Sequence, residues 1–238
     1  MKRRPKVAAI VVAAGAGTRF GGRVPKQFLT LQGQPLVIHT LRRFEEVREV
    51  DEIVAVVPES FLAEVETLLA RFRFQKVGAV VAGGRRRQDS VANGMKGLAL
   101  RASDIVLVHD GVRPFVDALQ IQNVIAESRK HKAAVLAVQP KDTVRRSSSG
   151  VVFDRTLDRT ALWLVQTPQA FTAGVLKKAI ALATERGLTV TDEAALVERM
   201  GIKARIVRGS YDNIKVTTQE DLELASLILA RWGVPAST

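Results

Sequence analysis

The chain has 238 residues, 47% of them hydrophobic, and carries 36 Lys and Arg against 24 Asp and Glu, for a net charge of +12. It can bury a sizeable core, and because it has no cysteine, disulfides, thiolate metal sites and cysteine nucleophiles are excluded. No apolar run approaches the roughly 20 residues that a membrane span needs, and the positive charge favours an anionic partner such as a phosphate ester, a nucleotide or a nucleic acid.

Short apolar runs alternate with segments of helical spacing. The start, Met1–Lys6, is basic, but the apolar run that follows reaches glycine too early for a signal peptide, so we expect a first strand there instead. The absence of cysteine fits a cytoplasmic protein. We predict strands at 7–14, 52–58, 76–83, 104–110, 132–140 and 202–209, and helices at 36–47, 59–72, 88–100, 117–130, 173–186, 192–200 and 218–232. Continuous apolar strands are typical of a parallel sheet covered on both faces. The alternation predicts an α/β, doubly wound, mostly parallel fold in a single domain, 1–238.

One segment, 141–168, has no helical periodicity. It resembles a strand, a Ser/Gly turn at Ser147–Gly150 and a second strand, which predicts a β-hairpin arm over about 141–160. A lone hairpin is only marginally stable in water. We therefore expect the arm to pack on a second subunit, as in a homodimer.

The first predicted strand runs into the glycine-rich stretch "AAGAGTRFGGRVPKQF". Gly15 and Gly17 begin a dinucleotide fingerprint, but Phe20 stands where its third small residue belongs, and no glycine is followed by Lys and Ser/Thr as in a P-loop. What remains is a close-approach turn with two cations, Arg19 and Lys26, seven residues apart. Such a loop at a strand's carboxyl end suits a ligand with more than one phosphate.

Further candidates follow other predicted strands. Asp110 ends the fourth strand, at the same sheet edge as the opening loop, and Arg113 is within reach of it, whereas His109 is more typical of a structural residue. "GGRRRQDSV" is a second glycine turn, in which Gly84 and Ser90 are candidates for base contacts and the run Arg85–Arg87 is interpreted as solvated. "TDEAALVE" indicates a helix start capped by Thr191. In "DNIKVT", alternation places Lys215 opposite its two apolar neighbours.

These motifs occur together with "KDTVRR" and "LDRTALWLVQTPQAF" in an order that resembles the 2-C-methyl-D-erythritol 4-phosphate cytidylyltransferase family over nearly the whole chain. The resemblance implies a Rossmann-like nucleotidyltransferase fold with a β-hairpin dimerisation arm. It also implies transfer of CMP from CTP to the phosphate of 2-C-methyl-D-erythritol 4-phosphate, which gives 4-diphosphocytidyl-2-C-methyl-D-erythritol and pyrophosphate. Mg²⁺ is the implied cofactor, held mainly by triphosphate oxygens, with no certain protein ligand.

The resemblance also implies roles for individual residues. Arg19 and Lys26 would stabilise the transition state, while Lys215, and Arg159 from the partner subunit, would position the acceptor phosphate. The remaining matched residues line the acceptor pocket (Asp110, Arg113, Thr143 and Thr167) or the nucleotide pocket (Ala13, Ala14, Gly15, Gly17, Gly84 and Ser90). The chain departs from the family in "GV" after Asp110, where "AA" is common, and in Arg85, where an acidic or polar residue is frequent.

Three other functions compete with this one. The acceptor could be another polyol phosphate, such as ribitol 5-phosphate, or the chain could be a basic nucleotide- or nucleic-acid-binding protein without catalysis. The third alternative is a dinucleotide-dependent oxidoreductase, which Phe20 disfavours because it stands where the fingerprint requires a small residue. Aromatic residues are only 5% and do not alternate with basic ones, so nucleic acid is the less favoured partner. No membrane partner is expected.

Overall fold

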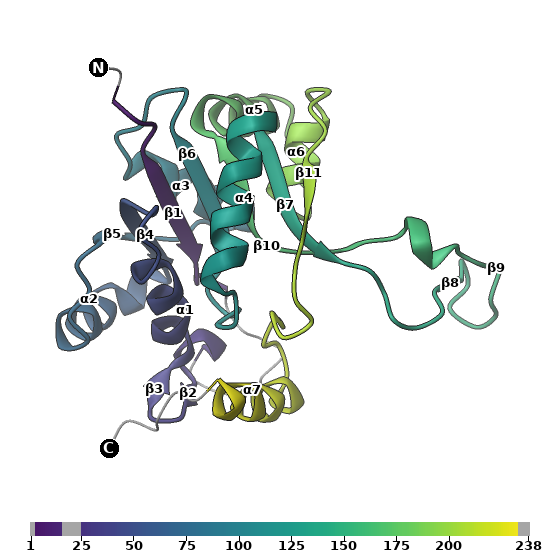
Figure 1. The fold of residues 1–238 in the computed structure, drawn as a ribbon, viewed down its shortest axis with the longest axis horizontal. Coiled ribbons are helices and arrows are strands. Elements are labelled where there is room, and N and C mark those ends of the chain that lie inside the picture. Colours follow the sequence, from purple (N-terminus) through teal and green to yellow (C-terminus); the bar gives the residue numbers. More distant parts are fainter. Residues whose placement is uncertain (1–2, 16–24, 233–238) are drawn as a thin grey trace.

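A seven-stranded sheet forms the centre of the computed structural model, which describes residues 3–15 and 25–232 (Figure 1). Its strands lie in the order β11, β7, β10, β6, β1, β4, β5. Their bounds are β1 Val7–Val12, β4 Glu52–Val57, β5 Val77–Ala82, β6 Ile105–Asp110, β7 Ala133–Val138, β10 Leu164–Thr172 and β11 Arg205–Arg208. All neighbours are parallel except β10, which runs antiparallel to both β6 and β7. The predicted doubly wound, mostly parallel sheet is confirmed.

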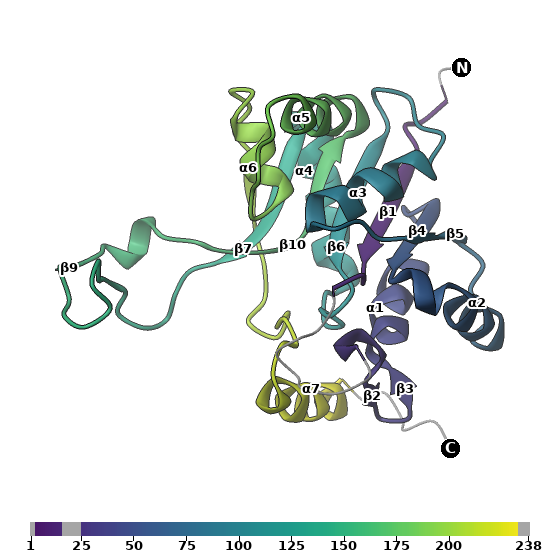
Figure 2. The same cartoon turned by 180° about the vertical axis from the view of Figure 1, so that it is seen from behind.

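Helices cover both faces of this sheet because its strands are apolar on both sides. One face carries α1 (Leu36–Glu45), α2 (Leu62–Arg71) and α4 (Ala118–His131), packed on alternate residues of β1 such as Ala9 and Val11. The other carries α3 (Arg87–Lys96), α5 (Ala173–Glu185) and α6 (Glu193–Glu198), packed on Ala8 and Ile10 (Figure 2). Among the described residues, no helix is both long and apolar enough to cross a membrane.

A third apolar cluster lies beyond the carboxyl ends of the strands. Here α7 (Gln219–Arg231) packs by Ile228 and Leu229 near the small hairpin of β2 (Thr30–Leu31) and β3 (Gln34–Pro35). The cluster includes Phe115 and Val216, and the Val216 N–H donates to the Val112 carbonyl over 3.0 Å. It thereby holds the segment before α7, which carries Lys215, against the end of the sheet.

The predicted arm is present but shorter than the irregular segment 141–168. Two-residue strands β8 (Arg145–Arg146) and β9 (Arg155–Thr156) pair at its end, well away from the sheet (Figures 1 and 2). Leu164–Pro168, which the sequence assigned to the hairpin, belongs instead to the central strand β10. Polar Gln166, Thr167 and Gln169 and the proline obscured this strand. A bulge between Val165 and Gln169 accommodates Pro168, which has no N–H to donate.

Candidate active site

A cavity opens where the strand order reverses. β4 and β5 follow β1 to one side and β6 lies on the other, with Val12 of β1 paired to Asp110 of β6. Open α/β sheets bind ligands at such a crevice, because the loops after the two strands diverge there. The cavity holds about 360 Å³ and is lined by Val12, Ala13, Ala14, Gly15, Lys26, Gln27, Gly84, Arg85, Arg86, Arg87, Ser90, Asp110, Val112 and Lys215. We call it the nucleotide cavity.

Small residues and internal hydrogen bonds shape one wall of the nucleotide cavity. Ser90 Oγ accepts a hydrogen bond from the Gly84 N–H over 3.0 Å, and Gln27 Nε2 donates to the Gly15 carbonyl over 3.1 Å. A Cβ added to Gly83 would lie only 2.1 Å from the Cβ of Ala14. The two glycine turns therefore lie in direct contact, and the wall has room only for small side chains.

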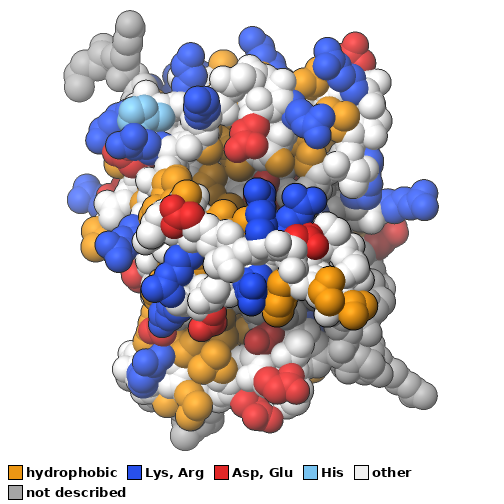
Figure 3. All heavy atoms as spheres, turned by 90° about the vertical axis from the view of Figure 1, so that its right-hand side faces the viewer, with side chains coloured by type: hydrophobic (Ala, Val, Ile, Leu, Met, Phe, Trp, Pro, Cys, Tyr) orange, Lys and Arg blue, Asp and Glu red, His pale blue; other side chains and the backbone are white. Residues whose placement is uncertain are grey.

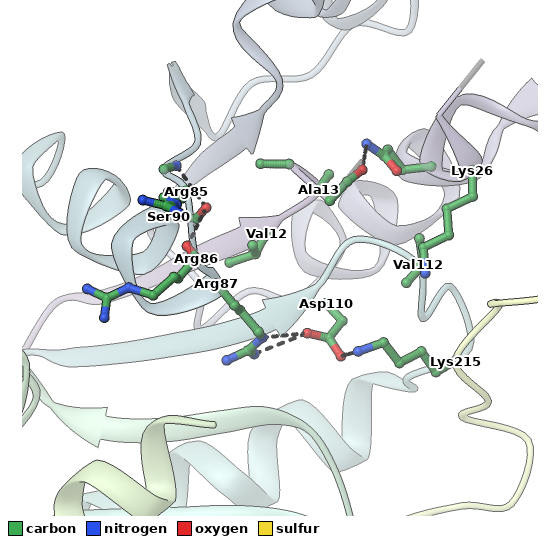
Figure 4. A pocket seen from close by; sticks show the side chains of 14 residues that line it. Val12, Ala13, Lys26, Arg85, Arg86, Arg87, Ser90, Asp110, Val112 and Lys215 are labelled. Atoms are coloured by element: carbon green, nitrogen blue, oxygen red, sulfur yellow. Dashed lines mark hydrogen bonds and ion pairs between the residues drawn. The ribbon is translucent and has the colours of Figure 1, made fainter. Parts of the chain in front are cut away.

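A second cavity of about 330 Å³ adjoins the first. It is lined by Arg87, Asp110, Arg113, Val165, Gln166, Thr167, Gln169, Thr191, Asp192 and Lys215. Arg87, Asp110 and Lys215 line both cavities and so form a shared wall (Figure 4). We call this second space the acceptor cavity. The predicted neighbours Asp110, Arg113, Thr167 and Lys215 are brought together here, from three separate parts of the chain.

Asp110 is the centre of the shared wall. Arg87 Nε and Nη2 both lie 3.1 Å from Asp110 Oδ1, while Lys215 Nζ lies 2.9 Å and Arg113 Nε 3.4 Å from Oδ2. Burial alone would raise the pKa of the Asp110 carboxyl, but the charges of Arg87, Lys215 and Arg113 outweigh burial and hold that pKa well below its ordinary value. Asp110 is therefore ionised at neutral pH although it is buried.

Sequence reasoning missed two charged residues of this network. Arg87, interpreted as one of a solvated run, is largely buried, and its Nη1 lies 2.6 Å from Oε1 of Glu193 and also contacts Oε2. Glu193, taken as part of an ordinary helix start, has a side chain only 1% exposed. The cap of α6 is Asp192, which accepts from the Ala195 N–H, and not Thr191 as predicted. A buried carboxylate directly after a cap has no sequence signal to distinguish it from a solvated one.

His109 is buried between the sheet and the segment after β6. Its Nε2 lies 2.9 Å from the Arg113 carbonyl oxygen and its Nδ1 lies 3.0 Å from Thr167 Oγ1, while the Asp110 N–H donates to the same hydroxyl over 3.1 Å. Burial lowers the pKa of His109 to about 4. The imidazole is therefore neutral near pH 7 and holds the loop after β6, in agreement with its expected structural role.

The other predicted site residues have different placements. Arg19 and Gly17 lie outside the described residues. Arg159, in a short 3₁₀ helix at Arg159–Ala161, and Thr143 are exposed on the arm, and neither is among the described residues that line the nucleotide cavity or the acceptor cavity. Arg159 Nη1 instead donates to the Lys141 carbonyl. Their assigned roles at the acceptor stay predictions.

Nothing in the described part of the chain forms a ready-made metal cage. Within it, no group of three or more His, Cys, Asp or Glu side chains could hold an ion. The carboxylates that line the two cavities are Asp110 and Asp192. Asp110 is paired with Arg87, and Asp192 accepts hydrogen bonds from the Ala195 N–H and from Gln169 Nε2. This donor set does not fit a protein-held divalent ion.

Comparison with known proteins agrees with this geometry. The sequence model of the family described as 2-C-methyl-D-erythritol 4-phosphate cytidylyltransferase matches residues 7–231. A curated protein of that name from Geobacillus kaustophilus (strain HTA426) is 46% identical over 222 residues, covering 93% of this chain and 96% of the relative. Another from Syntrophus aciditrophicus (strain SB) is 42% identical over 229 residues, covering 96% and 97%.

Solved structures show the same likeness. The 4-diphosphocytidyl-2C-methyl-D-erythritol synthase of Anaerococcus prevotii DSM 20548 superposes with a TM-score of 0.82 at 32% identity, covering 95% of this chain and 97% of that chain. The 2-C-methyl-D-erythritol 4-phosphate cytidylyltransferase of Thermus thermophilus gives 0.76 at 32% identity, covering 95% and 99%. The chain therefore belongs to the 2-C-methyl-D-erythritol 4-phosphate cytidylyltransferase family and is a cytidylyltransferase.

Proposed function

We propose that this enzyme transfers CMP from CTP to the phosphate of 2-C-methyl-D-erythritol 4-phosphate and releases pyrophosphate. One observation carries the proposal beyond family membership. Two cavities, one walled by small residues at a strand switch point and one lined by cations and hydroxyl-binding groups, meet at Arg87, Asp110 and Lys215. Two anionic substrates could therefore lie side by side across one charged wall.

The chemistry needs positioning more than it needs a base. A phosphate monoester is largely dianionic at neutral pH, because its second pKa is about 6. Its oxygen would attack the α-phosphorus of CTP, forming one P–O bond, while the bond to the β-phosphate breaks and pyrophosphate leaves with the electron pair. The obstacle is repulsion between two anions, which fixed cations reduce.

The cations of the site have separate parts in this proposal. Lys26 lines the nucleotide cavity, where its charge would meet the α-phosphate and the leaving pyrophosphate. Lys215 lines both cavities and would hold the attacking phosphate in line. We assign Arg19 to the same charge stabilisation as Lys26. The nucleoside would occupy the wall made by Ala13, Ala14, Gly15, Gly84 and Ser90, and we assign Gly17 to nucleotide binding as well.

Mg²⁺ would be carried by the triphosphate, because the described carboxylates do not offer it a cage. When bound there it would neutralise charge on the phosphate oxygens. The residues of the chain would still have to orient both substrates. Because CTP is an intracellular metabolite, we also propose a cytoplasmic location.

We further propose that the molecule is one domain whose arm pairs with a second copy. The arm exposes Val151 (88%), Val152 (65%) and Phe153 (64%), which is unusual for a monomer's hairpin. It also carries Arg159, which has no place in its own chain's cavities. Figure 3 shows the face from which the arm projects, where Lys and Arg side chains gather with hydrophobic ones between them. In a dimer, Arg159 and Thr143 would reach the partner's acceptor cavity.

The test is a pyrophosphate-release assay with CTP, Mg²⁺ and a panel of polyol phosphates. We expect the highest kcat/KM with 2-C-methyl-D-erythritol 4-phosphate. Faster turnover of ribitol 5-phosphate would assign a different acceptor. No turnover with any acceptor, together with salt-dependent binding to long polynucleotides, would favour the non-catalytic alternative.

A further inference from the structure

The Glu193–Arg87 pair has no part in the mechanism above, yet the Glu193 carboxylate is more deeply buried than Asp110, Arg113 or Lys215 of the same site. The Glu193 side chain is 1% exposed and that of Arg87 25% exposed. Burying two charges costs free energy that a mere helix anchor does not require. Helix α6 is already held by its Asp192 cap and by the Ala194 N–H, which donates to Gln169 Oε1 over 3.0 Å. The pair therefore needs another explanation.

Arg87 cannot easily serve as a phosphate ligand. Its Nε and Nη2 face Oδ1 of Asp110 (Figure 4). Its Nη1 faces both oxygens of Glu193, so all three nitrogens are directed at carboxylates. A planar guanidinium that bridges two carboxylates fixes both in position and direction. Arg87 thus connects buried α6 rigidly to the end of β6.

Asp110 transmits this constraint to the acceptor side. Its Oδ1 accepts from Arg87, which leaves Oδ2 to Lys215 and Arg113, the other two cations that line the acceptor cavity. Burial raises the pKa of the Glu193 carboxyl, and the charge of Arg87 opposes that rise. Asp110 is ionised, and its negative charge holds Lys215 over the shared wall. A shift of Asp110 would displace Lys215, the residue proposed to orient the attacking phosphate.

We propose that Glu193, acting through Arg87, is a positioning residue that sets the place of Asp110 and Lys215 and so determines acceptor alignment. This inference rests on the proposed function. It assigns Glu193 no contact with either substrate. It also separates Arg87 from its neighbours Arg85 and Arg86, which are exposed and make no contact with Asp110 or Glu193 in the structure.

The test compares Glu193→Gln, Glu193→Asp and Arg87→Lys with wild type. Glu193→Gln keeps the size of the side chain and removes its charge, whereas Glu193→Asp keeps the charge on a shorter side chain. Arg87→Lys keeps the positive charge but, with a single nitrogen, cannot bridge two carboxylates. We measure KM for the acceptor, kcat, the Kd for CTP by calorimetry, and the unfolding temperature.

We expect Glu193→Gln and Arg87→Lys to lower kcat/KM for the acceptor by about 10- to 100-fold, since misplacement by about 1 Å can cost that much. In Glu193→Gln the Kd for CTP should change less than about threefold, because Glu193 lines neither cavity, and Glu193→Asp should recover part of the loss. The matched control is Arg101→Ala, which removes an arginine paired with buried Asp104 just before β6, at the end of the sheet away from the cavities. Arg101→Ala should leave the KM for the acceptor, kcat and the Kd for CTP unchanged.

The pH profile is a second readout. Asp110 is faced by Arg87 from α3, Arg113 after β6, Lys215 before α7 and Glu193 from α6, with His109 beside it on β6. Among the neighbouring charges, that of Arg87 lowers the pKa of Asp110 most. Arg87→Lys removes the guanidinium, so the pKa of Asp110 should rise and the acidic limb of kcat/KM should move to higher pH.

Several outcomes would overturn the inference. One is an unchanged KM for the acceptor and an unchanged kcat in Glu193→Gln, and another is full activity of Arg87→Lys. Equal losses of affinity for CTP and for the acceptor would also contradict it. Unfolding of both variants would assign the pair to stability. Wild type in the same assay separates the two proposals. If it does not turn over the acceptor, the proposed function fails, whereas an active wild type with equally active variants overturns only the positioning role.

Discussion

Gly83→Ala should damage the nucleotide cavity by a steric effect that the structure allows to be estimated. Gly83 follows β5, and its N–H donates to the Val57 carbonyl over 2.8 Å. A Cβ at this position would lie 2.1 Å from the Cβ of Ala14, 3.1 Å from Ser90 Oγ and 3.6 Å from the Cα of Ala14. Because carbon atoms in contact stay about 3.5 Å apart or more, the two loops would have to separate by about 1.5 Å.

Overpacking of this kind costs about 1–3 kcal/mol. In a domain of this size each kcal/mol lowers the unfolding temperature by about 2–4 °C, so we expect a loss of about 2–12 °C. The strain could also be relieved by displacement of Ala14. Because Ala14 lines the nucleotide cavity, the cost would then appear as weaker CTP binding rather than as a lower unfolding temperature. The same free energy corresponds to a Kd raised about 5- to 150-fold.

The assay pairs calorimetric CTP titration with thermal unfolding. Gly97→Ala is the matched control, because Gly97 directly follows helix α3, has φ −72°, and its added Cβ would meet nothing closer than 3.5 Å. The double variant Ala14→Gly with Gly83→Ala removes one of the clashing methyl groups and should restore binding beyond the sum of the single effects. Wild-type affinity and unfolding temperature in Gly83→Ala alone would refute the reasoning.

Three further predictions concern other parts of the molecule. Lys26→Ala should lower kcat by about 100- to 1,000-fold with less than about a tenfold change in the Kd for CTP, and near-normal turnover would contradict its role. Because the folded-state pKa of His109 is about 4, below its ordinary 6.5, its contribution to the free energy of unfolding is present above pH 6.5 and is lost as pH falls, by about 3 kcal/mol down to pH 4. Denaturant titrations at pH 7, 5.5 and 4.5 should therefore show a smaller pH dependence in His109→Gln than in wild type, and equal slopes would disprove this. If the chain forms the proposed dimer, replacing Val152 and Phe153 with Asp should give a monomer in analytical ultracentrifugation and reduce turnover. A fully active monomer would show that no residue is needed from the partner.

The strand and helix pattern could be predicted because it depends on local chemistry. β1, β4, β6 and β7 are apolar on both faces, and this is visible as continuous runs of Val, Ile, Leu and Ala. The end of β6 also placed Asp110 at the same edge as the loop after β1, since parallel neighbours share their carboxyl edge. That inference used only strand direction, and the pairing of Val12 with Asp110 confirms it.

β10 could not be predicted in the same way. Its residues Gln166, Thr167 and Gln169 are buried but polar, so they interrupt the apolar run. Each has a partner far away in the chain: Gln166 donates to the Ser210 carbonyl, Thr167 contacts His109 and Gln169 donates to Asp192. Polar residues become suitable for a central strand only when such partners are present.

By itself, the sequence determined the alternating α/β architecture, the family, and the sheet edge at which the chemistry belongs, because these depend on periodicity and on motifs within short stretches. Only the tertiary structure decided which charges meet. Arg87 and Glu193 are 106 residues apart, and each resembles a solvated surface residue in its own segment. Their burial and pairing arise from packing α3 and α6 on one face of the sheet beside Asp110, and electrostatic contacts across such distances in the chain leave no local pattern.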